Sequence, residues 1–155
     1  MKIIGSFIAA LVLFGSSTFA RIGETEVQIE KRYGKPTSRS AWTKGYLHEG
    51  LFIIVTFDDR ISAIETYQKR NGAPMTAGEI CRLLEANGDG SEWEKSAGSD
   101  FEISYAAKTR FAEYNAITST LTIADYGALN RIDPRDRPKR AHLGVGLTCV
   151  RSIFK

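Results

Sequence analysis

The fold is decided by the stretch Leu51-Phe52-Ile53-Ile54-Val55-Thr56-Phe57, the most apolar run outside the N-terminal region. Its β-branched and aromatic residues are those that a central strand favours. Strand-like sequences lie on both sides, over residues 41–47 and 61–68, and turn residues separate them from it at 48–50 and 58–60. The pattern predicts a three-stranded antiparallel meander.

A short helix is expected before this meander, over residues 25–34. Thr25 can cap its first turn, and Gln28, three residues later, completes a capping box. Gly34 can take the left-handed backbone conformation that ends a helix, and Pro36 prevents its continuation. All local signals therefore agree on one helix of two to three turns that covers a face of the meander.

The same arrangement is found again 51 residues later, where Thr76 is a second capping residue and Glu79 its box partner. In both copies apolar residues follow the capping threonine at four and eight positions, namely Ile29 and Tyr33, and Ile80 and Leu84. Strand-like runs follow over 101–107, 110–116 and 119–124. The order favours two pseudo-repeated helix-plus-meander units. The alternative is that capped helices share this spacing for physical reasons alone.

The predicted fold class is therefore α+β, with two layers in which short helices pack on an antiparallel sheet. Residues 21–155 are long enough for a single domain with its own core. Its halves would be residues 21–72 and 73–130, followed by a basic C-terminal segment over 131–155. From Tyr126 the chain is expected to be loop-like until a last short strand at 147–150.

The first twenty residues are typical of a cleavable secretory signal peptide. One positive charge, Lys2, precedes an uncharged apolar run over 3–14, and small residues lead to Ala20. The run is shorter than the roughly twenty residues that a membrane-spanning helix needs, although an uncleaved anchor is the alternative. Since no cysteine stands at the cut site to carry a lipid, we expect a periplasmic or extracellular chain without a lipid anchor, starting at Arg21.

Charge argues against nucleic acid as a partner. The net charge is +3, and loss of Lys2 with the signal peptide leaves a charge too mild for that role. Basic residues gather in the segment 131–155, at Arg131, Arg135, Arg137, Lys139, Arg140, Arg151 and Lys155. This segment could meet an acidic partner or an anionic membrane surface, or it could be a solvated loop with no partner.

The two cysteines, Cys81 and Cys149, are candidates for a disulfide because an even pair in an oxidising compartment favours pairing. Such a crosslink would stabilise the fold by about 4 kcal/mol on the chain-entropy estimate. The alternative is a pair of separate buried thiols.

The sequence over Gly23–Pro36, read as Gly-x-Thr-x3-Ile-x3-Tyr-Gly-x-Pro, resembles the opening motif of the small outer-membrane assembly lipoproteins (BamE/SmpA-like). In that family a helix with this signature packs on a three-stranded antiparallel meander. The beta-lactamase inhibitory proteins look like two tandem units of a related kind. This chain departs from the lipoproteins in lacking the lipid-bearing cysteine, and its second helix lacks Gly-x-Pro. The resemblance implies the fold and a non-catalytic binding role, but it does not identify the partner.

Patterns for catalysis are weak. No Gly-x-Ser-x-Gly nucleophile elbow is present. The histidines, His48 and His142, lie at unrelated positions, and Asp58-Asp59 fits hairpin-turn chemistry better than a catalytic carboxylate pair. Two distant cysteines and these histidines do not make a metal site. We therefore expect no catalytic residues, cofactor or metal.

Five aromatic residues form the candidate binding surface, because interfaces favour Trp and Tyr at their centres. They are Trp42, Tyr46, Trp93, Tyr105 and Tyr114. The alternative is that a thin two-layer domain uses them as core.

These patterns are compatible with three functions. The leading hypothesis is an exported, non-enzymatic binding or cell-envelope scaffold protein that acts through an open sheet face, with an unknown protein partner. The second is a secreted inhibitor of an enzyme, whose turn at Asp58–Arg60 enters a cleft. The third is a hydrolase with an unrecognised site.

Overall fold

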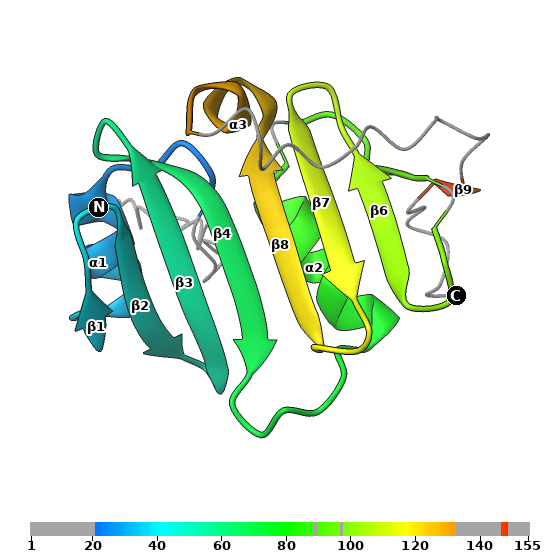
Figure 1. Cartoon of the computed structure of the whole chain (residues 1–155), viewed down its shortest axis with the longest axis horizontal. Coiled ribbons are helices and arrows are strands. Elements are labelled where there is room, and N and C mark those ends of the chain that lie inside the picture. Colours follow the sequence, from blue (N-terminus) through cyan, green and yellow to red (C-terminus); the bar gives the residue numbers. More distant parts are fainter. Residues whose placement is uncertain (1–20, 89, 97, 133–146, 149–155) are drawn as a thin grey trace, which may run out of the picture.

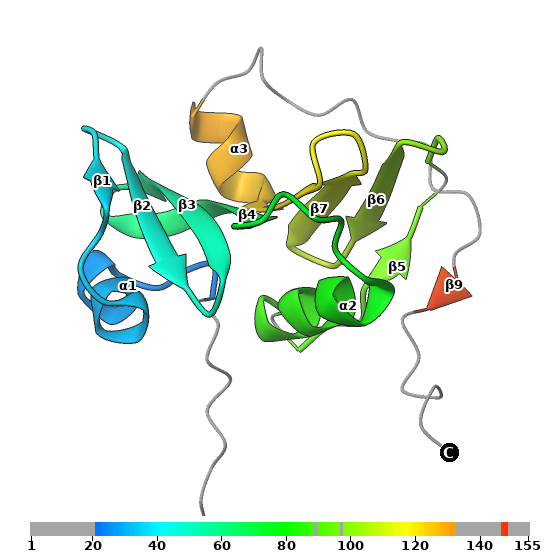
Figure 2. The ribbon, with the colours of Figure 1, turned by 90° about the horizontal axis from the view of Figure 1, so that it is seen from below.

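The computed structural model describes residues 21–88, 90–96, 98–132 and 147–148, and its centre is one antiparallel sheet with three short helices (Figure 1). The strands run in the order β1-β2-β3-β4-β8-β7-β6-β5-β9. Helices α1 and α2 lie on one face of the sheet, and α3 lies on the other (Figure 2). The expected packing of short helices on an antiparallel sheet is confirmed.

The two halves of the chain have the same order of elements: a helix, a two-residue strand and a three-stranded meander. The first half consists of α1 (Glu26–Tyr33), β1 (Ser38–Arg39), β2 (Thr43–His48), β3 (Leu51–Asp58) and β4 (Ile61–Lys69). The second consists of α2 (Ala77–Ala86), β5 (Glu94–Lys95), β6 (Glu102–Ala106), β7 (Arg110–Asn115) and β8 (Thr120–Asp125). The final strands of the two meanders, β4 and β8, pair at the centre and join the halves into one sheet.

The predicted helix signals are confirmed in both halves. The Thr25 hydroxyl accepts the backbone N–H of Gln28, and the Gln28 side chain accepts the N–H of Thr25 at 2.8 Å. Gly34 ends α1 with a φ of 84°, a left-handed value that glycine tolerates. The second capping box, between Thr76 and Glu79, starts α2 in the same way.

Some elements differ from the sequence prediction. The loop expected from Tyr126 is wrong, because α3 (Tyr126–Ile132) begins there. The Asp125 carboxylate caps it by accepting the N–H of Ala128 at 2.9 Å. His48, expected in a turn, ends strand β2. Of the predicted last strand, Leu147–Thr148 forms β9, which pairs with β5, and residues 149–150 lie outside the described residues.

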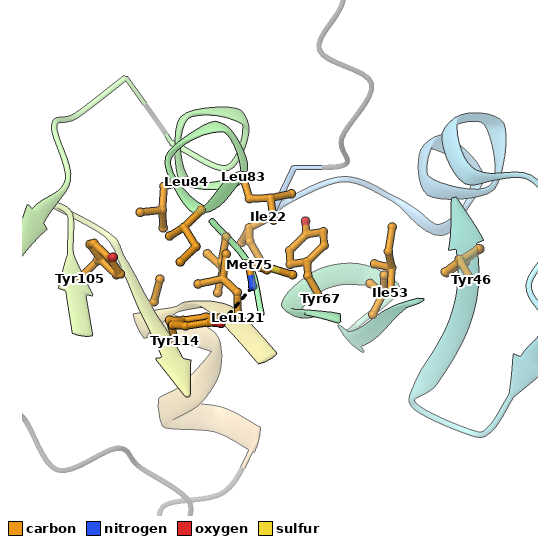
Figure 3. Close-up of a cluster of buried hydrophobic side chains, with 14 of the residues drawn as sticks. Ile22, Tyr46, Ile53, Tyr67, Met75, Leu83, Leu84, Tyr105, Tyr114 and Leu121 are labelled. Carbon is orange, nitrogen blue, oxygen red and sulfur yellow. Dashed lines mark hydrogen bonds between the residues drawn. The ribbon is translucent and has the colours of Figure 1, made fainter. Parts of the chain in front are cut away.

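The core lies between the sheet and the layer formed by α1 and α2 (Figure 3). Ile29 of α1 and Leu84 of α2 are both fully buried. Between the helices, Tyr67 of β4 packs beside Ile22. The expected face of α1, through Ile29 and Tyr33, is therefore confirmed as its buried side.

Residues 21–24, which we call the N-terminal strap, are fastened to both halves. The backbone N–H of Ile22 donates to Asn87 Oδ1 at 3.0 Å, and Arg110 Nη2 donates to the Ile22 carbonyl at 3.0 Å. The N–H of Gly23 donates to the carbonyl of Ser62 at 2.8 Å. With its side chain in the core, Ile22 links α2 and β7 of the second half to β4 of the first.

Candidate functional site

The sheet has two chemically different faces, because successive side chains of a strand point to opposite sides. The helix face packs against α1 and α2 and carries, for example, the cross-strand neighbours Tyr46, Ile53 and Tyr67, all buried. The opposite side, toward the viewer in Figure 1, is called the open face because, in the part of the chain that the structure describes, helix α3 alone lies on it and covers one end (Figure 2).

Three cross-strand rows of side chains make up the open face. From β2 to β6, the Phe52 row contains Leu47, Phe52, Gln68, Thr120, Asn115 and Glu102. The Ile54 row contains Gly45, Ile54, Thr66, Thr122, Glu113 and Ser104. The Phe111 row contains Thr43, Thr56, Ile64, Ala124, Phe111 and Ala106.

Helix α3 packs over the Phe111 row. The rings of Phe111 and Tyr126 lie 6.3 Å apart, and Ala128 is buried. Beyond them, Arg131 Nε donates to Asp58 Oδ2 at 2.6 Å, which ties the helix to the β3–β4 turn. The α3 contacts described here therefore fall on the Phe111 row and on the β3–β4 turn, and none of them reaches the Phe52 or Ile54 row.

Three large apolar side chains stand together on the first-half side of these two rows, and we call them the apolar patch. Leu47, Phe52 and Ile54 are 37%, 44% and 51% exposed. Leu47 and Phe52 are direct cross-strand neighbours. Gly45, opposite Ile54, has no side chain to shield it, and a Cβ there would lie 2.4 Å from the Ser38 hydroxyl. A side chain at this position would therefore require the Ser38 hydroxyl to move.

A strip of hydroxyl groups follows at the junction of the halves. Thr66 and Thr122 face each other across β4 and β8, with their hydroxyl oxygens 3.2 Å apart. In the next row Gln68 Nε2 donates to the carbonyl of Thr118 at 3.0 Å. The strip is polar but satisfied by its own hydrogen bonds.

On the second-half side, Glu102 of β6 and Glu113 of β7 form a carboxyl pair. Burial, followed by the hydrogen bond and the charge of Glu102, raises the pKa of Glu113 to about 7. The direct cross-strand neighbours of Glu113 are Ser104 and Thr122, which carry no charge. The open face thus changes from apolar to acidic along its two uncovered rows.

The structure corrects the predicted aromatic surface. Only Trp42 is exposed, at 70%. The other four members are buried in the core, because they lie on the helix face or, for Trp93, under α2, where its indole N–H donates to the carbonyl of Leu84 at 2.8 Å. They are Tyr46, Trp93, Tyr105 and Tyr114. The predicted alternative, that such residues form core, applies to these four.

A buried polar cluster on the helix face was not anticipated from the sequence. Glu65 is fully buried, and the Tyr67 hydroxyl donates to its Oε2. Asn87 Nδ2 in turn donates to the Tyr67 hydroxyl at 3.0 Å. Burial, which outweighs the hydrogen bond from Tyr67, raises the pKa of Glu65 to about 7. With Glu65 and Tyr67 fully buried, the cluster is a structural junction rather than a site that substrate can reach.

A cavity of about 560 Å³ lies on the helix face, between the β2–β3 turn and the start of α2. Its lining residues are Glu49, Gly50, Leu51, Lys69, Arg70, Asn71 and Glu79. Lys69 Nζ is 2.9 Å from Glu79 Oε2, and the same carboxylate accepts the N–H of Thr76. The Lys69 hydrogen bond and the Thr76 N–H lower the pKa of Glu79 to about 2. The charges of Lys69 and Glu79 are therefore already matched to each other within the fold.

The other residues singled out in the sequence lie apart from the open face. The ring of His48 packs 5.1 Å from that of Tyr33 on the helix face, and His142 lies outside the described residues. Asp59 and Arg60 have φ values of 48° and 65°, which confirms the predicted hairpin turn. Among the described residues, no group of three or more His, Cys, Asp or Glu side chains is placed to hold a metal ion.

Cys81 on α2 is disulfide-bonded. Its predicted partner, Cys149, lies outside the described residues, so the identity of the pair stays a prediction. The same holds for most of the basic segment 131–155, of which the structure describes residues 131, 132, 147 and 148.

Comparisons with known proteins found no matching family model, no matching curated protein and no matching solved structure. No helix in the described part of the chain is both long and apolar enough to span a bilayer.

Proposed function

We propose that this chain is an exported, non-enzymatic protein-binding domain of the cell envelope, and that its partner packs on the open face of the sheet. The observation that carries the proposal is the apolar patch of Leu47, Phe52 and Ile54, which the described residues leave exposed on one sheet face. Single exposed apolar residues are normal, but contiguous ones on a regular element mark interaction sites. An antiparallel sheet can leave one face to water, and that face is then usually polar.

The order of elements supports a tandem arrangement like that of the beta-lactamase inhibitory proteins, with each half resembling a BamE/SmpA-like unit. Both helices start with a threonine capping box, and both halves continue with a two-residue strand and a meander. Thr66 and Thr122 pair at the middle of the β4–β8 ladder, where a pseudo-two-fold axis between two units would pass. We therefore propose that the halves are repeats of one unit.

Export is supported by the strap and by the disulfide. Ile22 enters the core directly after the predicted cut at Ala20, so cleavage there would leave the strap intact. Disulfides persist in the periplasm and outside the cell, and Cys81 is disulfide-bonded.

The test compares capture by two variants of the purified full chain in envelope extract of the native host. Phe52→Asp/Ile54→Asp places charges in the apolar patch, whereas Val27→Asp alters an apolar residue of α1 that is 78% exposed and far from the open face. Bound proteins are fixed to the bait by chemical crosslinking. We expect the double variant to lose the partner that the wild type captures, and the control to keep it. Equal capture by wild type and both variants would refute the proposal.

The inhibitor hypothesis is a special case that the same experiment separates. An inhibitor should return one dominant enzyme, whose activity falls on titration with wild type. The turn at Asp58–Arg60 does not favour this case, because Asp58 is held by Arg131 and the Arg60 carbonyl accepts the N–H of Glu26 at 3.3 Å. The turn is therefore bound to its own fold on both sides.

A further inference from the structure

The two uncovered rows of the open face divide into chemically distinct ends. At the first-half end stand the three members of the apolar patch. The charged side chains in the two rows, Glu102 and Glu113, both stand at the other end. A partner that covers the face must therefore match apolar surface at one end and negative charge at the other.

The carboxyl pair is a costly arrangement for the isolated chain. Two carboxyl groups in contact repel when both are ionised, and partial burial of Glu113 removes part of the water that would screen them. Among the described residues, the interactions that shift Glu113 are burial and Glu102, and no cation is among them. A cationic side chain brought by a partner would relieve this repulsion.

The two ends lie within the footprint of one ordinary partner. Ile54 and Glu113 share a row and are separated by three strand-to-strand steps, from β3 through β4 and β8 to β7. At the usual strand spacing this is about 14 Å. A standard protein interface is wider than this on each side, so one partner can contact both ends.

Resting on the proposed function, we propose that the partner is a protein segment that presents a lysine or arginine to Glu102 and Glu113 and an apolar side chain to Leu47, Phe52 and Ile54. Charge complementarity argues against three other occupants. Nucleic acid and anionic lipid surfaces would be repelled by the carboxyl pair. A second copy packed face to face about a central two-fold axis parallel to the strands would set the carboxyl pair of one chain against the apolar patch of the other. An axis perpendicular to the strands would set the two carboxyl pairs against each other.

The test uses a random twelve-residue peptide library displayed on phage, selected against four full-length baits. They are the wild type, Glu102→Gln/Glu113→Gln, Phe52→Ser/Ile54→Ser and the control Val27→Ser. All substituted positions are at least partly exposed, and circular dichroism establishes that each bait is folded. The best peptide is then synthesised and its affinity measured by fluorescence anisotropy.

We expect the wild type and the control to enrich peptides that combine lysine or arginine with aromatic or aliphatic residues. The Gln variant should lose the enrichment of basic residues and bind the best peptide about tenfold or more weakly, while apolar enrichment remains. The Ser variant should lose both. Raised salt should weaken binding to the wild type and leave binding to the Gln variant nearly unchanged.

Each contrary result has a distinct meaning. Equal enrichment of basic residues on the wild type and the Gln variant, or no enrichment at all, would overturn the inference. If apolar enrichment still requires Phe52 and Ile54, the proposed function survives that result. If apolar enrichment does not require them, the proposed function and the inference about the partner both fail. A wild-type dimer in sedimentation that Phe52→Ser/Ile54→Ser converts to monomer would identify a second copy as the occupant and also overturn the inference.

Discussion

Helices α1 and α2 hold the same place in the two halves but are attached to the sheet by different chemistry. The second helix buries four residues, Ile80, Leu83, Leu84 and Ala86. The first buries only Ile29 and Tyr33, and ion pairs supplement this small apolar contact. Lys44 Nζ on β2 lies 2.9 Å from Glu26 Oε2 and 2.8 Å from Glu30 Oε1, with only 11% of the Lys44 side chain exposed.

On the open face the halves differ in the opposite sense, because the first half is the apolar one and the second half carries the charges. The first-half end of this face is apolar and its second-half end is acidic, although both are built on three-stranded meanders. The comparison teaches that cap residues and strand order are sufficient to place the elements, while the residues between them decide how each helix is held and what each surface can bind. Three experiments would break or sharpen this contrast.

The largest effect is expected from Leu84→Ala in the apolar contact of α2. Leu84 is fully buried, so its truncation should lower the free energy of unfolding by about 2–5 kcal/mol. Urea unfolding followed by far-UV circular dichroism and by the fluorescence of Trp93, which is buried in the same half, measures the loss. Because β4 and β8 join the halves, both signals should shift together. Separate transitions would show that the halves unfold independently.

A second effect, of about 3 kcal/mol, is expected at the junction from Glu65→Gln. The pKa of Glu65 rises from 4.5 in the unfolded chain to about 7 in the fold, so the fold binds its proton more tightly. The resulting stability is fully present below pH 4.5 and is lost as the pH rises through 7. Because glutamine is neutral at every pH, the Gln variant lacks this loss of stability and should show a correspondingly flatter pH dependence in urea unfolding between pH 5 and 8.

Tyr67→Phe is the matched comparison for Glu65. The Tyr67 hydroxyl donates to the carboxylate and lowers its pKa, so the Phe variant should raise that pKa further and extend the loss of stability to higher pH. A pH dependence identical in the wild type and both variants would assign the titration to another group.

The smallest effect is expected from Lys44→Met, which removes the ion pairs of α1 and keeps an unbranched side chain. Glu26 and Glu30 are about one-third exposed, so the loss should be about 1 kcal/mol and should shrink in 1 M salt. Thermal unfolding at low and high salt measures it. Insensitivity to salt would mean that α1, like α2, is held by apolar contact.

Local signals were sufficient to predict the helices α1 and α2 and the meander strands, because capping boxes and apolar runs act within a few residues. Helix α3 was missed although Asp125 is a good cap, since its seven residues include Gly127 and Asn130, which weaken the helical pattern. The two-residue strands β1 and β5 carry no period that sequence could reveal.

To predict which face of the sheet a side chain lies on, the pairing register of the strands must be known, and no local sequence pattern gives that register. The predicted binding aromatics were placed on the surface, yet Tyr46 faces Ile53 and Tyr114 faces Leu121 on the helix face. A register shift at Thr56/Phe57 also breaks the alternation of β4, so that Ser62 and Ala63 are both buried. Without the register, the burial of Glu65 in the core could not be predicted. The apolar patch and the carboxyl pair likewise depend on which strands pair with each other.

The N-terminal strap imposes an order of events on the chain. Ile22 is fastened by Asn87 and Arg110, which stand 65 and 88 positions later. Because a chain is synthesised from its N-terminus, the strap is present long before these two partners. The backbone bonds of Gly23 and Glu24 to Ser62 can form within the first half, whereas the bonds of Ile22 to the second half can form only after Arg110 has been synthesised.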